Sequence, residues 1–223
     1  MSFTRYAIYF VPPEGGLADF GARWLGWDVG TGREAPQFNL PGLDDVTMTP
    51  RKYGFHATLK PPFRLAPGRS LVELRSAVEA LATTTAPALA DGLALSRLGR
   101  FLALTLDGDA SAVSRVAARC VEALDDFRAL AGAEDLARRR KPGLSARQDE
   151  LLLRWGYPYV MEAFRFHMTL TGRLSPDQAA HWTQAVQAHL PDMPRPFRLD
   201  QIALVGERAD GMFELVQRYD LRG

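Results

Sequence analysis

The sequence predicts an α+β fold built from two copies of one unit, and three observations carry this prediction. The pentapeptide Phe-His-x-Thr-Leu occurs twice, as FHATL at 55–59 and as FHMTL at 166–170. A helix-capping pattern follows each copy, and two strand-like segments follow each predicted helix. The order strand, helix, hairpin therefore repeats, and we expect repeat units of roughly residues 1–107 and 108–223.

Each element of the first half has its own evidence. Aromatic and β-branched residues mark the strands, prolines end two of them, and apolar residues at helical spacing mark the first helix. Ser70 and Glu73 form a capping box at the start of the second helix. A Gly- and Pro-rich stretch predicts a long functional loop or lid. The expected elements are, in order, a strand (5–13), a helix (16–28), the loop (29–50), the motif strand (56–60), the capped helix (70–82) and a hairpin (93–98 and 101–106).

The second half follows the same order after two helices. Ser145 with Gln148, and Ser175 with Gln178, have the spacing of capping boxes. Gly and Pro residues end the predicted helices, and alternating apolar residues mark the strands. The expected elements are, in order, a helix (111–130), a helix (145–156), the motif strand (165–171), a helix (175–190) and two strands (197–206 and 212–221).

The repeated motif places a histidine and a threonine on one face of each strand. Side chains on a strand alternate between faces, so His56 and Thr58 point away from the side that Phe55, Ala57 and Leu59 occupy. The residues expected on the equivalent face of the second strand are His167, Thr169 and Thr171. Residues two apart on one face lie roughly 6.5 to 7 Å apart, so an imidazole and a hydroxyl can both reach a phosphate-sized group.

Two such faces brought together predict an acid–base site for an anion. The unperturbed pKa of histidine is about 6.5, so one ring can be neutral while the other is protonated near pH 7. His56 and His167 are therefore the candidate catalytic pair, one taking a proton from the attacking oxygen and one giving a proton to the leaving oxygen. Which is acid and which is base does not follow from the sequence. Thr58 and Thr169 are candidate donors to the phosphoryl oxygens.

Cations and one tyrosine near the motifs are further candidates for phosphate binding. Lys60 has the strand parity of the first histidine, and Arg173 follows the second motif, so both would stabilise phosphoryl charge. Arg51 and Tyr53 precede the first motif and would contact a phosphate, with a solvated loop as the alternative. The run ARRRK at 137–141 has two interpretations: cations near a helix C-terminus, or an electrostatic guide for an anionic substrate.

Other chemistries lack support in the sequence. Neither motif has a second metal ligand near its histidine, and clusters of Cys, His or carboxylate residues at ligand spacing do not occur. Cys120 lies in a helical apolar stripe, which predicts a core residue and not a nucleophile. A Gly-rich phosphate loop followed by Lys-Ser/Thr is absent from the sequence. We therefore expect no metal and no cofactor.

The composition of the chain limits the kinds of binding partner that we expect. The 223 residues are 47% hydrophobic and 24% charged with a net charge of +1, which is typical of a globular protein and unlike one that binds many nucleic-acid phosphates. We expect a small phosphorylated substrate and no nucleic-acid partner. The N-terminus lacks the pattern of a signal peptide and the chain lacks a long apolar run, which predicts a cytoplasmic protein without a membrane partner. Oligomeric partners cannot be predicted.

At the motifs HATL (56–59) and HMTL (167–170) the sequence resembles the two-histidine (2H) phosphoesterase superfamily, which includes 2′-5′ RNA ligase-like proteins and cyclic nucleotide phosphodiesterases. The segments YGFHATLKPPF, RWGYPYV and RFHMTLTGR are most similar to a bacterial branch named for its association with phosphonate-utilisation operons. The resemblance implies one bilobal domain over residues 1–223, in which two pseudo-twofold related antiparallel-sheet-plus-helix units enclose a central cleft.

The resemblance also implies a reaction. It implies metal-independent hydrolysis of a small cyclic or 2′-5′-type phosphodiester, with a sugar cyclic phosphate in phosphonate metabolism as one candidate. The loop at 29–50 and the helical segment near 144–155 look like additions that cover the cleft, so RNA processing is not expected. The alternative is a non-catalytic binding or sensor protein for a phosphorylated metabolite. Both interpretations place an anion between the histidines, and turnover distinguishes them.

Overall fold

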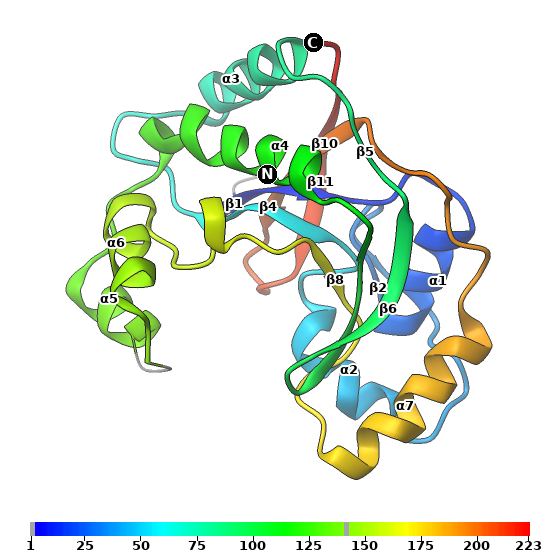
Figure 1. Cartoon of the computed structure of the whole chain (residues 1–223). Helices are drawn as coiled ribbons and strands as arrows, with labels where there is room; N and C mark the ends of the chain where they lie inside the picture. Colours follow the sequence, from blue (N-terminus) through cyan, green and yellow to red (C-terminus); the bar gives the residue numbers. More distant parts are fainter. Residues whose placement is uncertain (1–2, 141–142) are drawn as a thin grey trace.

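The structure, a computed structural model that describes residues 3–140 and 143–223, contains one antiparallel sheet of seven strands in its described part (Figure 1). Every pairing between neighbouring strands of this sheet is antiparallel. The predicted α+β class is therefore confirmed. In spatial order, the strands are β11 (Phe213–Asp220), β10 (Gln201–Glu207), β1 (Tyr6–Phe10), β4 (Ala57–Phe63), β8 (His167–Thr169), β7 (Phe101–Asp107) and β6 (Gly92–Leu98).

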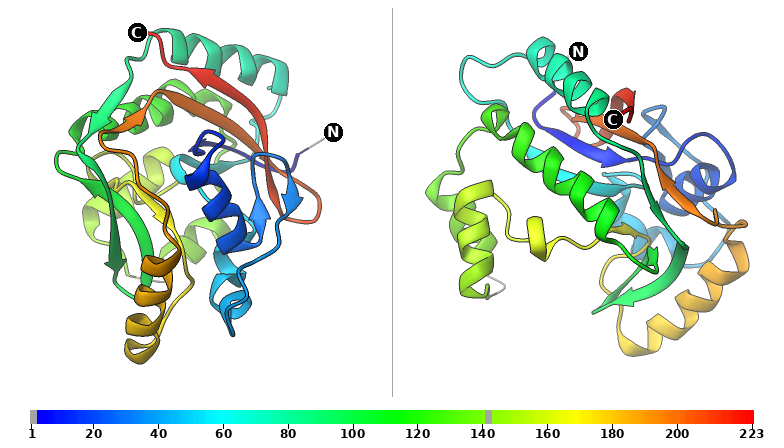
Figure 2. Two further views of the ribbon diagram at one scale, coloured as in Figure 1. Left: turned by 90° about the vertical axis from the view of Figure 1, so that its right-hand side faces the viewer. Right: turned by 45° about the horizontal axis from the view of Figure 1, so that its top comes forward.

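Helices cover one face of the sheet. The main core lies between this face and the apolar sides of α1, α3, α4 and α7, and α3 and α4 run across the sheet in Figure 2. The three predicted capping boxes, at Ser70, Ser145 and Ser175, are present. The α-helices of the described residues are α1 (Gly16–Leu25), α2 (Leu43–Arg51), α3 (Leu71–Thr83), α4 (Ser111–Ala123), α5 (Ala133–Arg140), α6 (Ala146–Trp155) and α7 (Pro176–His189). None of these helices is both long and apolar enough to cross a bilayer.

The two halves of the chain interlock at the sheet. The motif strands β4 and β8 are neighbours at its centre. The hairpin β6–β7 comes from the first half of the sequence but pairs with β8, whereas β10–β11 comes from the second half and pairs with β1. A second connection, between β5 (Ala88–Ala90) and β9 (Phe197–Leu199), also joins the halves. Residue 107, after which the order of elements starts again, is therefore not a boundary between two separately folded units.

Strand β4 continues through Pro61 and Pro62, where the sequence predicted its end. Both prolines lie in an irregular part of the register with β1, between the pairs Ile8–Lys60 and Tyr6–Phe63. On its other side, β4 pairs with β8 only at Ala57. Proline cannot donate a ladder hydrogen bond, and it is tolerated where such bonds are missing.

The stretch 29–50 is not the long loop or lid that its composition predicts. It contains β3 (Arg33–Glu34), which pairs with β2 (Trp27–Asp28), and most of α2, which packs against α1. Helix α2 begins after Gly42, whose backbone is in the left-handed region. The helix has no side-chain cap at its start and carries Pro50 in its last turn. The usual start signal of a helix is thus missing, which explains the wrong prediction.

The helix predicted over 111–130 ends at Ala123. A 3-10 turn (Asp125–Phe127) follows, and it brings Phe127 into the core. The backbone amide of Ala66 then donates to the carbonyl of Phe127. This docking ends the helix early, and the separate helix α5, which the sequence did not predict, follows it.

Candidate active site

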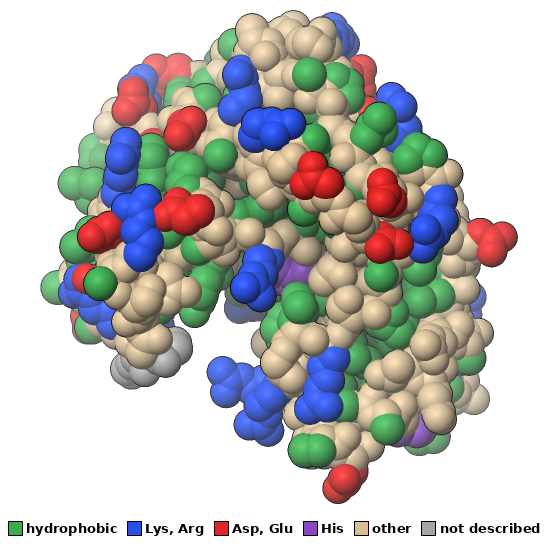
Figure 3. Space-filling view, viewed as in Figure 1, with side chains coloured by type: hydrophobic (Ala, Val, Ile, Leu, Met, Phe, Trp, Pro, Cys, Tyr) green, Lys and Arg blue, Asp and Glu red, His purple; other side chains and the backbone are tan. Residues whose placement is uncertain are grey.

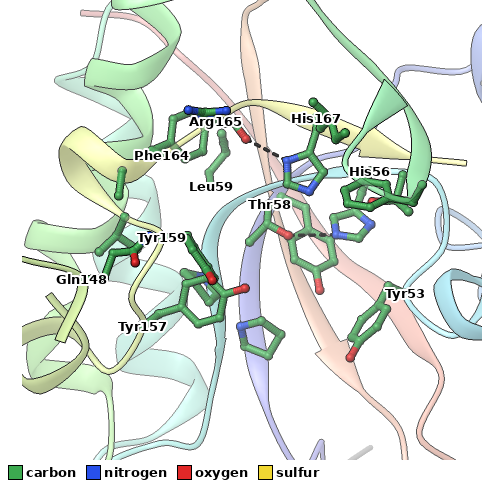
Figure 4. A pocket seen from close by; sticks show the side chains of 18 of the residues that line it. Tyr53, His56, Thr58, Leu59, Gln148, Tyr157, Tyr159, Phe164, Arg165 and His167 are labelled. Carbon is green, nitrogen blue, oxygen red and sulfur yellow. Dashed lines mark hydrogen bonds between the residues drawn. The ribbon is translucent and has the colours of Figure 1, made fainter. Parts of the chain in front are cut away.

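The two His-x-Thr segments lie side by side at the centre of the sheet (Figure 4). The antiparallel register pairs Ala57 with Met168, the residues between each histidine and its threonine. Each histidine therefore lies opposite the threonine of the other strand. Opposite side chains of such a pair have Cβ atoms about 4.5 to 5.5 Å apart and diagonal ones about 7 to 8 Å apart. The two histidines are thus placed diagonally across a space of phosphate size.

The other face of each motif enters the core, as the alternation predicts. The buried residues are Phe55, Ala57, Leu59, Phe166, Met168 and Leu170. The four polar residues of the motifs are partly exposed and line one cavity of about 960 Å³. Figure 3 shows this hollow between the part of the molecule with α5 and α6 and the part with β6, α2 and α7, with a histidine at its inner end.

Both imidazole rings are oriented by the same kind of hydrogen bond. Nδ1 of His56 lies 2.9 Å from the carbonyl oxygen of Gly54, and Nδ1 of His167 lies 2.8 Å from that of Arg165. A carbonyl oxygen only accepts, so Nδ1 carries the proton in each ring. Nε2 is therefore the nitrogen available for proton transfer. In His56 it accepts from the hydroxyl of Thr58 at 3.0 Å.

The surroundings of the two histidines differ. His56 stacks on the buried ring of Tyr9, with ring centroids 3.7 Å apart and an interplanar angle of 20°. Burial lowers the pKa of His56 to about 4, although the Gly54 carbonyl raises it, and the charge of His167 lowers it further. His56 is therefore neutral at pH 7, which suits a general base.

Gly54 is required by the position of His56. Its φ of +70° is in the left-handed region, which aims its carbonyl at the imidazole. A Cβ atom at this position would lie 2.5 Å from Cβ of Val29. Only glycine meets both conditions without strain. Nothing in the sequence alone singles out this residue.

Lys60 does not lie in the cavity, which corrects its predicted role in phosphate binding. Thr58 pairs with Tyr9 and Lys60 pairs with Ile8, so β4 has one extra residue, Leu59, at a β-bulge. The bulge reverses the strand parity after Thr58. The side chain of Lys60 points into the core, where Nζ donates to the Val121 carbonyl at 2.9 Å and burial lowers the pKa of the ammonium to about 8.

Of the other predicted phosphate ligands, one lines the cavity and two do not. Tyr53 lines the cavity, near His56. Arg51 instead joins α2 to α1, because its Nε donates to the carbonyl of Leu25 at 2.8 Å. Arg173 is not part of the cavity lining, and Thr171 is buried with its hydroxyl bonded to backbone groups. The structure thus gives Arg51 and Arg173 no contact with the paired histidines.

Several cavity residues were missed by reasoning from the sequence. Two segments, 29–50 and 144–155, were expected to cover the cleft. Only the second lines the cavity, through Gln148 on α6. The missed side chains share positive charge or an aromatic ring: Arg5, Arg97, Phe101, Arg139 and Arg165. Tyr9, Tyr157 and Tyr159 also line the cavity, although the sequence favoured packing over ligand contact for them. They come from segments far apart in the sequence, so spacing could not bring them together. The one signal was the run 137–141, for which an electrostatic role was one of two interpretations.

The residues that the structure describes contain neither a metal-ligand cluster nor an exposed cysteine. Within residues 3–140 and 143–223, no group of three or more His, Cys, Asp or Glu side chains could hold a metal ion. Cys120 is buried on α4, and burial raises the pKa of its thiol to about 12.

The fold and site define a two-histidine cavity on the antiparallel sheet of an α+β fold. The chain belongs to the family described as Protein of unknown function (DUF1045), whose model matches residues 58–214. Relatives described as Ribose 1,5-bisphosphate phosphokinase PhnN are 42% identical over 179 residues in Janthinobacterium sp. (strain Marseille) and 37% identical over 189 residues in Laribacter hongkongensis (strain HLHK9). These matches cover 78% and 83% of this chain but 40% and 44% of the relatives, so the chain spans less than half of their length.

Solved structures with similar folds are more distant in sequence. TT0787 of Thermus thermophilus is 17% identical with a TM-score of 0.47, and E. coli LigT complexed with 3′-AMP is 12% identical with a TM-score of 0.41. Each comparison covers 98% of both chains. A structure described as a phosphoesterase is 12% identical with a TM-score of 0.43 and covers 99% of both chains.

Proposed function

We propose that this chain is a metal-independent phosphodiesterase that hydrolyses a small cyclic or 2′-5′-type phosphodiester. The observation that carries the proposal is the antiparallel register of the two His-x-Thr segments, which places two imidazoles and two hydroxyls around one space in a cavity. Displacement at phosphorus needs a proton acceptor, a proton donor and hydrogen bonds to the non-bridging oxygens. The four side chains supply all three.

The different surroundings of the histidines support a division of roles between them. Neutral His56 takes a proton from water at Nε2 while the water oxygen attacks phosphorus. The ester P–O bond breaks, and His167 gives its Nε2 proton to the leaving oxygen. The product is a phosphomonoester with a free hydroxyl, and proton exchange with solvent restores both rings. Thr58 turns its hydroxyl from His56 to a non-bridging oxygen when substrate binds, and Thr169 bonds the other.

A sugar cyclic phosphate is the favoured substrate class. The relatives act, by their names, on a phosphorylated ribose. Their kinase activity is not carried over, because this sequence lacks the Gly-rich loop with Lys-Ser/Thr that binds nucleoside triphosphates. The resemblance of the motif segments to a phosphonate-operon branch points to the same kind of small phosphorylated sugar.

Phosphorus NMR with a panel of cyclic phosphates tests the proposal. We expect ring opening by the wild type and a loss of about 10² to 10⁴ in kcat for His56→Ala and for His167→Ala, the range of a positioned acid or base. His181→Ala is the matched control, because His181 lies on α7 outside the cavity lining. Circular dichroism checks that each variant is folded.

Two results would contradict the proposal. Turnover that survives in both cavity histidine variants would exclude the acid–base mechanism. Binding shifts without any product from the wild type would favour the alternative, a sensor of a phosphorylated metabolite.

A further inference from the structure

The cavity is larger and more cationic than the four motif residues require. Its lining includes Arg5, Arg97, Arg139 and Arg165, and a single carboxylate, that of Glu162. Glu162 is paired with Arg147, which lies outside the lining. Arg5 is likewise paired, with Glu207 outside the lining, so the excess of positive charge in the cavity comes from Arg97, Arg139 and Arg165, for which the described residues show no ion pair. An anion between the histidines alone does not account for arginines that come from four different parts of the fold.

Arg139 stands out within the run of three arginines at the end of α5. Arg138 pairs with Asp135, and Arg140 pairs with Asp149 through an Nε–Oδ1 contact of 2.6 Å. Arg139 lies between them in sequence but lines the cavity, and no ion pair joins it to a carboxylate of the described residues. Arg138 and Arg140 thus form ion pairs at the surface, and of the three arginines only Arg139 lines the cavity.

The side chain of Arg139 is held in place by an aromatic ring, but its hydrogen-bonding capacity is not fully used. Its guanidinium lies 5.1 Å from the centre of the Tyr157 ring, a cation–π contact. Its Nε is buried and has no hydrogen-bond partner in the part of the chain that the structure describes. A buried unpaired donor is costly, and a ligand that accepts from it removes the cost.

Arg5 and Arg139 line the same cavity. Burial lowers the pKa of Arg139, and the charge of Arg5 is among the smaller causes that lower it further. Arg5 is held by Glu207, with its Nε donating to Oε2 at 2.6 Å. Both guanidinium groups line the same cavity, so an anion bound there would be attracted by each of them. The same cavity lining contains His56 and His167, and it also contains Tyr9, whose ring stacks on His56.

We propose that Arg139 and Arg5 form a second anion subsite beside Tyr157, and that the substrate carries a phosphomonoester separate from the diester that is cleaved. The proposal rests on the proposed function and adds a second recognition element to it. A phosphomonoester carries about 1.5 to 2 negative charges at pH 7 and accepts several hydrogen bonds, which matches two guanidinium groups. The phosphodiester binds between His56 and His167, and the monoester binds at the α5 side of the cavity.

Calorimetric binding to the double variant His56→Ala/His167→Ala tests this subsite without turnover. The probes are methyl riboside 2,3-cyclic phosphates with a 5-hydroxyl, a 5-phosphate or a 5-carboxylate. We expect the 5-phosphate to bind at least tenfold more tightly than the other two. Adding Arg139→Ala should weaken binding of the 5-phosphate about 10- to 100-fold, the range for a charged hydrogen bond, and Arg139→Lys should recover part of it.

Arg138→Ala is the matched control, because it removes the neighbouring charge from the same helix without touching the cavity lining. Equal affinity for all three probes, no detectable binding of any probe, or the same loss in Arg138→Ala as in Arg139→Ala would overturn the proposal. Equal affinity for the 5-carboxylate and 5-phosphate would overturn the assignment to a phosphomonoester. Wild-type turnover of the same probes is measured separately, so failure of the subsite and failure of the phosphodiesterase proposal are distinguishable.

Discussion

His56 and His167 have equivalent positions in their motifs but unequal environments. Each donates from Nδ1 to the carbonyl two residues earlier. Only His56 is covered by a stacked tyrosine ring, and burial there lowers its pKa to about 4. The repeat in the sequence thus produces two similar rings, and the unmatched residues around them produce the difference that an acid–base pair needs.

The low pKa of His56 predicts the acid side of the pH profile. A general base must be neutral, so kcat/KM should rise with pH through a midpoint near 4 and not near the ordinary value of 6.5. Tyr9→Ala removes the ring that covers His56, admits water and should move this midpoint upward. Initial rates between pH 3.5 and 8 measure both midpoints. A wild-type midpoint at or above 6.5 would be incompatible with His56 as the base.

At the residue scale, the sequence predicted the two histidines, the two threonines and Tyr53 as neighbours of one cavity. Strand alternation and the repeat of the motif were enough for the four motif residues. It could not predict Gly54, Arg5, Arg97 or Arg165, and it left Tyr9 undecided between core packing and ligand contact. Their places depend on contacts between distant segments, such as the stacking of Tyr9 on β1 against His56 just before β4.

At the scale of elements, β4 serves both the cavity and the core. Its first residues present Thr58 to the cavity, and the bulge at Leu59 then turns Lys60 to the opposite face. Counting residues along one strand cannot reveal this, because a bulge is a property of the pairing between two strands. The same limit explains α2, whose start depends on the backbone of Gly42 and on packing against α1.

Lys60→Met tests the structural role of the buried lysine. The change removes a hydrogen bond to the Val121 carbonyl and a contact of 3.6 Å to Asp125. We expect a loss of about 1 to 3 kcal/mol in the free energy of unfolding, since Asp125 keeps Arg128 as a partner. KM should stay within about twofold of wild type, whereas Thr58→Ala, which removes a cavity hydroxyl, should lower kcat/KM at least tenfold. Urea denaturation and initial rates measure these effects, and a large rise in KM for Lys60→Met would restore a phosphate-binding role.

At the scale of the whole molecule, the repeat in the sequence and the arrangement in space differ. The sequence predicted two units in succession, and it predicted the order of elements within them well. The sheet instead pairs the motif strand β8 with the hairpin of the first half, and β1 with the hairpin of the second half. Nothing in the spacing of elements distinguishes pairing within a half from pairing between halves, so only the structure reveals this exchange.

Separate production of residues 1–107 and 108–223 tests the interlocked arrangement. Each fragment lacks the hairpin that its own strands pair with, so we expect both to show little sheet signal by circular dichroism and no turnover. Mixing the two during refolding should restore both, because the cut falls in the exposed turn before α4. A stable, folded fragment of residues 1–107 alone would show that the halves are independent.

The pairing of each hairpin with the other half also sets the order in which a growing chain can complete its sheet. When β1 and β4 have left the ribosome, the strand that protects the free edge of β1 is still about 140 residues from synthesis. A nascent or prematurely terminated chain therefore displays an unpaired apolar strand, a common starting point for aggregation. The sheet is completed only when the last hairpin pairs with β1, so chaperones and proteases that act on a nascent chain meet an incomplete sheet.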